Sequence, residues 1–198
     1  MHTPDTFRST FAAALPYARY LETAEPHQLA GWKAFDARVS LTDAQKSVLR
    51  SVKRRVNILV ISGTWCGDCV QQCPILAHFE RAMPADAASP DSPGIALRFI
   101  DRDEFASFAT PFKICGGQRV PAAIFLNEDF EFISLFGDKT LSRFRTLAAK
   151  SLGPSCPLPG APVPSDEIAA TTSDWLDEVE RVALLLRLSG RLRQKHAD

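Results

Sequence analysis

The sequence has no net charge, no long apolar run and too few cysteines for a secreted disulfide framework. Acidic and basic residues number 23 each, so no long-range field favours nucleic acid or an anionic membrane surface as a partner. No stretch approaches the roughly 18 to 20 apolar residues that span a bilayer, and residues 1–20 lack the pattern of a signal peptide. We expect a cytoplasmic protein that binds neither nucleic acid nor membrane.

The five cysteines are unevenly placed, and three of them, Cys66, Cys69 and Cys73, fall within one short segment. Thiols stay reduced in the cytoplasm, and a chain of 198 residues can bury a core without disulfides. Two cysteines separated by two residues therefore indicate a reactive or metal-binding pair more than a structural staple.

Cys66 and Cys69 lie between a predicted strand and a predicted helix. The apolar, β-branched run 56–61 is typical of a strand buried on both faces, and from Gly67 apolar residues recur at helical spacing. The positive end of that helix dipole points at Cys66 and favours its thiolate. We therefore expect Cys66 to be the nucleophile and Cys69, one turn further in, to resolve a mixed disulfide.

The remaining pattern predicts an α/β protein with a mixed sheet of about four strands, flanked by helices. The segment 42–45 has the form of a capping box and starts a helix before the first strand. Strands are predicted at 56–61, 95–100, 122–126 and 130–136, and further helices at 103–110 and 141–152. Helical spacing dominates residues 1–41, so no strand is expected there.

We divide the chain into four segments. Residues 1–41 form an N-terminal helical extension, 42–152 the α/β domain, 153–165 a proline-rich linker, and 166–198 a C-terminal helix that packs on the same domain. Ser173 is the predicted N-cap of that helix, and its arginine-rich end at 187–195 is predicted to be solvated. The predicted buried stripe of this helix consists of Leu176, Val179, Ala183 and Leu186.

The ordered set of motifs in residues 42–152 resembles the thioredoxin family. The motif Trp65-Cys66-Gly67-Asp68-Cys69 follows an apolar strand, and Pro74 lies five residues past its second cysteine. Val120-Pro121 opens a later strand, and Gly137 follows the predicted hairpin. A lone Cys-x-x-Cys is moderate support, whereas this ordered set is specific. The resemblance implies a thioredoxin-like fold and a thiol-disulfide oxidoreductase.

By this resemblance the substrate is a disulfide in a protein or a small molecule, and no bound cofactor is required. Electrons would come from an external thiol or a disulfide reductase. Pro121 would be in the cis form and would lie against the two cysteines. Trp65, Val120 and Pro121 would shape a groove that receives an extended substrate segment.

Two positions depart from the family pattern. Val60 stands where thioredoxins commonly bury an aspartate that assists proton transfer to the resolving cysteine, and Asp68 stands where proline is usual. We hypothesise that Asp68 takes over part of the proton handling and that its charge offsets some of the helix dipole's effect on Cys66. The pKa of Cys66 should then lie above that of the thioredoxin nucleophile, about 7. An upward movement of that pKa in Asp68→Pro would contradict the hypothesis.

Two other functions fit parts of the sequence. Cys66 and Cys69 could form half of a zinc site completed by Cys73, Cys115 or His78, because Cys-x-x-Cys is also metal-ligand spacing. A second such pair is missing, and zinc explains neither the tryptophan nor the proline of the family motifs. The other alternative is an interaction module that binds a partner through its added helices and uses the dithiol as a redox sensor.

Four further residues have simpler explanations. Cys73 is predicted to be a packed core thiol, although it could act as an alternative resolving cysteine. Cys115 is predicted to be buried and inert, and Cys156 to be an exposed free thiol in the linker. Asp101, at the end of a predicted strand, is more simply a loop-capping carboxylate than a displaced proton acceptor.

Overall fold

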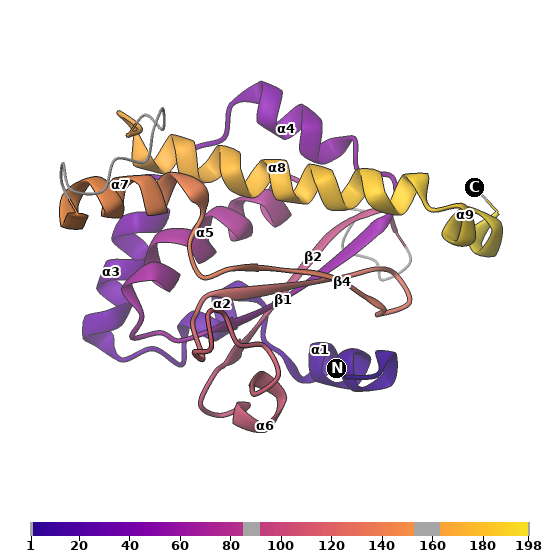
Figure 1. Cartoon of the computed structure of the whole chain (residues 1–198), viewed down its shortest axis with the longest axis horizontal. Coiled ribbons are helices and arrows are strands. Elements are labelled where there is room, and N and C mark those ends of the chain that lie inside the picture. The colour runs from indigo at the N-terminus through magenta and orange to yellow at the C-terminus, as the bar shows by residue number, and fades with distance from the viewer. Residues whose placement is uncertain (1, 85–91, 153–162, 198) are drawn as a thin grey trace.

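A mixed sheet of four strands lies between two groups of helices in the computed structural model, which describes residues 2–84, 92–152 and 163–197 (Figure 1). The strand order is β2-β1-β3-β4, in which β1 and β2 are parallel and β3 is antiparallel to both of its neighbours. The predicted fold class and strand number are confirmed. The strands are β1 Arg55–Ser62, β2 Gly94–Asp101, β3 Ala122–Leu126 and β4 Phe132–Gly137.

The two inner strands carry the most apolar sequences because helices or strands cover them on every side. Every residue of β3 is buried, and so is every residue of β1 except Arg55. β4 lies at an edge of the sheet and is only half-buried along its whole length. The uninterrupted apolar runs therefore mark the centre of the sheet, as expected for strands that are buried on both faces.

Helices cover both faces of the sheet. In Figure 1, α4, α5 and α8 lie on one side of the strands, whereas α1 and α6 lie on the other. The predicted capping box is present, because the Thr42 hydroxyl accepts from the Gln45 amide and the Gln45 side chain accepts from the Thr42 amide. The helices are α1 Pro4–Ala13, α2 Tyr17–Leu21, α3 Pro26–Asp36, α4 Asp43–Arg50, α5 Gly67–Arg81, α6 Ala106–Ala109, α7 Leu141–Leu152, α8 Glu167–Leu188 and α9 Gly190–His196.

The N-terminal extension is helical, as predicted, and covers the free edge of β2. Leu15, between α1 and α2, pairs with Phe99 through two backbone hydrogen bonds of 2.9 and 2.8 Å. The ring of Tyr20 stacks on Phe99 with centroids 5.2 Å apart. An exposed edge strand is a template for unwanted pairing, and this extension closes it with one isolated bridge and aromatic packing.

The prediction that Ser173 caps the last long helix is wrong, because α8 begins at Glu167. Its N-cap is Asp166, whose carboxylate accepts from the Ala169 amide at 3.0 Å. The first turns of α8 bury Thr171 and Thr172 instead of aliphatic residues, so the apolar stripe of the sequence begins too late to mark the helix start. Residues 153–162, most of the predicted linker, lie outside the described residues.

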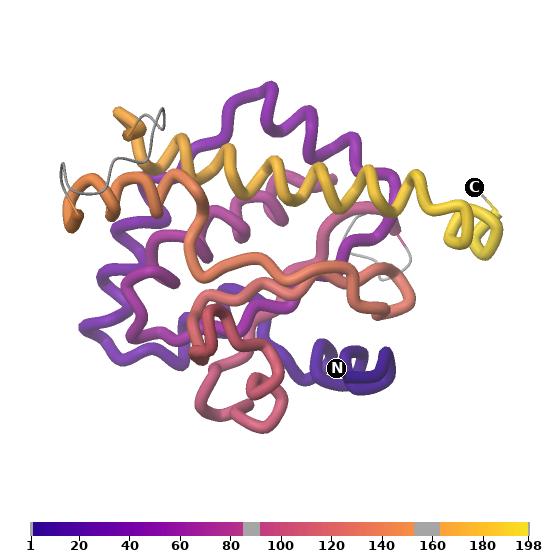
Figure 2. Tube along the Cα trace, viewed as in Figure 1, coloured from indigo at the N-terminus to yellow at the C-terminus, as the bar shows by residue number. Residues whose placement is uncertain are grey.

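The arginine-rich C-terminal segment is not simply solvated, which corrects a second prediction. The backbone breaks at Ser189, and the short helix α9 turns back onto the connection between β3 and β4. Leu192 is buried there, Arg191 pairs with Glu131, and Lys195 lies 2.7 Å from Asp129. Figure 2 shows this yellow end of the chain on the opposite side of the strands from the indigo N-terminus.

The pairing register brings four chain segments together at one end of the sheet, where β1 and β2 finish. Ile61 pairs with Ala122 and Ala122 pairs with Gly137, so the start of β3 lies beside the end of β1, and the end of β4 lies beside the start of β3. Ser62 pairs with Asp101 at the end of β2. β1 and β2 are parallel, and ligands commonly bind in the crevice outside the carboxyl ends of parallel strands, which here is this end of the sheet.

The substitution Gly137→Ala should destabilise the folded protein. Gly137 has φ 138°, and a Cβ atom there would overlap the carbonyl oxygen of Pro121 and lie 3.2 Å from its carbonyl carbon. We expect the free energy of unfolding to fall by about 3 kcal/mol, measured by urea denaturation. Gly31→Ala is the matched control, because open space surrounds Gly31 within α3, and it should be neutral or slightly stabilising. Equal stability of the two variants would contradict the packing argument.

Candidate functional site

Cys66 occupies the N-cap position of α5, immediately beyond β1. Its φ and ψ of −88° and 120° are extended, and its amide donates to the Gly63 carbonyl at 3.0 Å. Cys66 is half-buried, whereas Cys69 is fully buried on the first turn of the helix. Both are free thiols. One sulfur is therefore accessible to a substrate and the other is reached only through it.

The environment raises the pKa of both thiols. A hydrogen bond with Cys69, followed by burial, raises the pKa of Cys66 above its ordinary value, while the amides of Cys69 and Asp68 offset part of the rise. Burial raises the pKa of Cys69 well above its ordinary value. The direction for the pKa of Cys66 is the expected one, but the neighbouring thiol and burial cause it, whereas the expectation rested on the charge of Asp68.

The segment that contains Pro121 lies beside Cys66, and its peptide bond has the form that the family resemblance implies. The Val120–Pro121 peptide bond is cis. The Cys66 thiol donates to the Val120 carbonyl at 3.5 Å, so the segment before β3 faces the exposed sulfur directly. The shaping of a substrate groove by Trp65, Val120 and Pro121 stays a prediction.

Arg102 joins the two sides of this site. Its guanidinium lies 4.6 Å from the centroid of the Trp65 ring, and its Nη1 donates to the Gln118 carbonyl at 3.3 Å. Trp65 is 48% exposed and packs over Gly63, where a Cβ atom would meet the indole ring. Arg102 therefore ties the residue before Cys66 to the segment that leads to Pro121.

Trp32 in the N-terminal extension also holds the loop before Cys66. It is fully buried in α3, and its Nε1 donates to the Thr64 carbonyl at 2.8 Å. A buried carbonyl without a partner would be costly, so this bond fixes the backbone two residues before the nucleophile. The sequence pattern showed that Trp32 was apolar and helical but gave no sign of this partner.

Both carboxylate oxygens of Asp68 are paired with cations that follow β4. Arg143 of α7 lies 2.7 Å from one oxygen, and Lys139 lies 2.8 Å from the other. Arg143 is also paired with Glu167 of α8 and with Gln71. The proton-handling role predicted for Asp68 stays a prediction, and it would require Asp68 to give up one of these partners.

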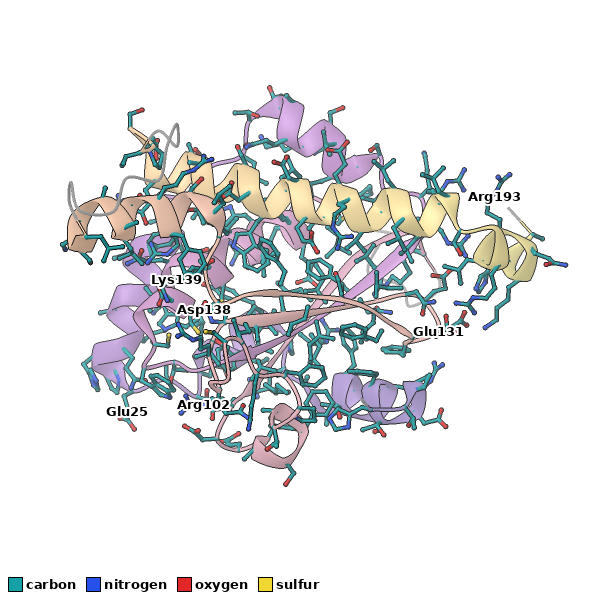
Figure 3. The ribbon with its side chains drawn as sticks, in the orientation of Figure 1. Glu25, Arg102, Glu131, Asp138, Lys139 and Arg193 are labelled. Carbon is teal, nitrogen blue, oxygen red and sulfur yellow. The ribbon has the colours of Figure 1, made fainter. Side chains whose placement is uncertain are left out.

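Asp138 is a buried carboxylate at the same end of the sheet as Cys66, and the sequence pattern did not single it out. Figure 3 shows it with Lys139 between β4 and α7, at the same end of the sheet as Arg102. Burial alone would raise the pKa of Asp138, but the hydrogen bond and charge of Lys139, together with Arg119, offset this and lower it. Asp138 is therefore an ionised anchor for two cations and a poor proton acceptor at neutral pH.

Gln72 connects this anchor to the start of α5. It is fully buried, and its Nε2 donates to the Asp138 carbonyl at 2.8 Å and to the Asp68 carbonyl at 3.3 Å. Its Oε1 accepts from Trp175 of α8 at 3.3 Å. The C-terminal helix thus reaches the cysteine helix through one amide side chain, an arrangement that no local motif announced.

The other sequence candidates divide in two. Cys73 is a fully buried core thiol, and Asp101 accepts from the amides of Asp103 and Glu104, so both structural predictions are confirmed. The prediction that Cys115 is buried is wrong, because a tight turn with φ 49° at this residue exposes it.

The described part of the chain contains no set of ligands for a zinc ion. His78 faces Asp36, with Nε2 3.1 Å from its carboxylate. No group of three histidine, cysteine or acidic residues among 2–84, 92–152 and 163–197 is arranged to hold a metal ion.

In the same ranges no helix has the length and apolar character needed to cross a membrane. Cys156 lies outside them.

Comparison with known proteins identifies the family. A family model described as thioredoxin matches residues 14–141. The chain belongs to the thioredoxin family. The match begins inside the segment that we treated as an extension and ends at the start of α7. The predicted domain boundaries stay predictions.

Solved structures share the fold of this thioredoxin-family chain. A protein of unknown function from Pseudomonas aeruginosa is 19% identical with a TM-score of 0.64, over 92% of this chain and 99% of that one. An HIV epitope-scaffold is 17% identical with a TM-score of 0.56, over 87% and 97% of the two chains. At these identities the likeness shows the fold alone. No curated protein gives a significant match.

The raised thiol pKa values predict a stability difference between the reduced and oxidised forms. Below the pKa of an unfolded cysteine, about 8.5, the buried thiols are neutral and cost nothing. As the pH rises past that value, the unfolded chain loses protons that the folded chain keeps, so the reduced protein should lose stability.

In the oxidised protein neither cysteine titrates, so the decline should be shallower. Urea denaturation of both forms between about pH 7 and about pH 10 measures the difference. Tyr17 and Tyr20, whose pKa values burial also raises, are common to both forms and cancel in the comparison. Identical pH dependence of the two forms would contradict the burial argument.

Arg143→Met should destabilise the protein by about 2 kcal/mol. The variant keeps an unbranched side chain but leaves Asp68 and Glu167 without their shared cation. Because these carboxylates are 23% and 35% exposed, water should offset part of the cost of a fully buried charge. Lys150→Met, on the exposed face of α7, is the control and should change the free energy of unfolding little. An unchanged free energy of unfolding in Arg143→Met would mean that the pairing of Arg143 with Asp68 and Glu167 adds no stability.

Proposed function

We propose that this protein is a thiol-disulfide oxidoreductase that reduces disulfides in proteins or small molecules through Cys66 and Cys69. The observation that carries the proposal is the placement of a half-buried thiol at the N-terminus of α5, with a second, fully buried thiol on the first turn of the same helix. The first can reach a substrate, and the second can reach only the first. This asymmetry is what a nucleophile and a resolving cysteine require.

The reaction has two exchange steps. The Cys66 thiolate attacks one sulfur of the substrate disulfide, which forms a mixed disulfide and releases the other substrate sulfur as a thiolate. Cys69 then loses its proton and attacks the Cys66 sulfur, which forms the Cys66–Cys69 disulfide and releases the second substrate thiol. Two electrons pass from the dithiol to the substrate, and an external thiol or disulfide reductase returns them.

The raised thiol pKa values support reduction over oxidation as the direction of transfer. A dithiol oxidant works because its reduced form is stabilised as a low-pKa thiolate. Here a hydrogen bond and burial raise the pKa of Cys66, and burial raises that of Cys69, so neither thiolate is specially stabilised. The price is a small thiolate fraction at neutral pH, so the rate of attack should increase with pH.

The surroundings of Cys66 suit an extended disulfide substrate. The half-exposed indole of Trp65 offers an apolar surface on one side. On the other side, the backbone at Val120 and Pro121, just before β3, could pair with an extended segment as in strand addition. In this proposal these three residues bind the substrate, and no bound cofactor takes part.

Single substitutions of the two cysteines test the proposal. Cys66→Ser should abolish reduction of a protein disulfide such as that of insulin, because no exposed dithiol thiol remains to attack. Cys69→Ser should accumulate a mixed disulfide between Cys66 and the substrate, which non-reducing electrophoresis and mass spectrometry detect. Cys115→Ser, at the exposed turn, is the control and should retain full activity. Undiminished reduction by Cys66→Ser would overturn the proposal.

A further inference from the structure

Cys69 must ionise in an environment that opposes a negative charge. Its side chain is fully buried, and burial raises its pKa. In the proposed reaction, on which this inference rests, Cys69 must nevertheless become the attacking thiolate in the second step. A group close to Cys69 has to offset part of that cost.

Two carboxylates of this region are already paired with other groups, and valine stands where thioredoxins commonly bury an aspartate. Asp68, on the same helix, is held by Arg143 and Lys139. Asp101, at the end of β2, accepts from two backbone amides of its own loop. No carboxylate stands at position 60 on β1, where Val60 is fully buried.

The N-terminal extension contributes two tyrosines to the far side of this region. Tyr17 and Tyr20 of α2 are buried, and burial keeps both phenols neutral by raising their pKa values. The Ser62 hydroxyl offsets part of the rise in the pKa of Tyr20, although no hydrogen bond joins the two hydroxyls. These phenols are too weakly acidic to exchange protons with a thiol at neutral pH.

The hydroxyl of Ser62 is a buried polar group close to these sulfurs. Side chains alternate along a strand, so Ser62 projects from the same face of β1 as Val60. Its Oγ lies 3.8 Å from the Cys73 sulfur, and both residues are fully buried. Cys73 is one helical turn past Cys69 on the same face of α5. Burial raises the pKa of Cys69 and the Ser62 hydroxyl offsets part of that rise, so Ser62 lies close to both buried sulfurs.

We propose that the Ser62 hydroxyl, held by Cys73, donates toward Cys69 as its thiolate forms and lowers the cost of the second exchange step. Ser62 is a positioning residue in this step, since it neither forms a bond to the substrate nor keeps a proton. The bond between Cys66 and the substrate sulfur breaks while the Cys66–Cys69 bond forms. The departing substrate thiolate takes up the proton that Cys69 loses, so no further reactant is needed.

The pair Ser62→Thr and Ser62→Val isolates the hydroxyl. The two side chains have nearly the same shape and both suit a strand, but only threonine keeps the donor. Both are made in a Cys115→Ser/Cys156→Ser background, so that the remaining thiols are Cys66, Cys69 and Cys73. Each protein is mixed with a chromogenic aromatic disulfide. The first equivalent of coloured thiol reports attack by Cys66, and the second reports attack by Cys69.

We expect Ser62→Val to slow the second phase about tenfold near neutral pH and to move the midpoint of its pH profile upward by about one pH unit. Ser62→Thr should keep the profile of the parent protein. The first phase should differ by less than about twofold among the three proteins, because the Cys66 thiol is hydrogen-bonded to the Val120 carbonyl and the Ser62 hydroxyl to Cys73. A general loss of structure would expose both thiols and alter the first phase as well as the second.

Equal second-phase profiles for the threonine and valine variants would overturn the inference, whether or not both differ from the parent. If Ser62→Val does not fold, as judged by circular dichroism, Ser62→Ala replaces it with the same expected upward shift, and an unshifted profile is equally contradictory. Failure of the proposed function looks different. In that case the parent protein itself would release no second equivalent of coloured thiol.

Discussion

The hydrogen-bonded register of β1 with its neighbours is the constraint on which the site depends. It fixes Ala122 opposite Ile61 and Gly137 opposite Ala122, so Pro121 and the end of β4 must lie at the end of the sheet where β1 leads to Cys66. A slip by one residue would turn every side chain of a strand to the other face and remove this meeting point. The apolar sequences of β1 and β3, buried on both faces, make such a slip costly.

Segments outside the sheet complete the site instead of merely surrounding it. Trp32 holds the backbone before Cys66 from α3, and Trp175 reaches the cysteine helix from α8 through Gln72. Arg143 binds Asp68 from α7 and Glu167 from α8 at once. The two exchange cysteines therefore lie where helices from both ends of the chain converge. Changes in these helices should be felt in thiol reactivity as well as in stability.

The sequence predicts what depends on local pattern and fails where a distant partner decides. Strand positions, the capping box at Thr42 and the cis Pro121 follow from periodicity and family motifs. The start of α8 was misplaced because buried threonines carry its first turns, and the exposure of Cys115 depends on a turn that leaves no apolar signature. The pairing of Asp68 could not be predicted, because its partners lie more than 70 positions along the chain.

The central claim is that Cys66 and Cys69 form one redox couple at this sheet edge, and an equilibrium measurement tests it most directly. The protein is incubated in glutathione buffers of graded reduced-to-oxidised ratio, quenched in acid, alkylated and mapped by mass spectrometry. We predict one two-electron transition that pairs Cys66 with Cys69, while Cys73 remains alkylated as a thiol throughout. The absence of a Cys66–Cys69 disulfide at any ratio would contradict the account.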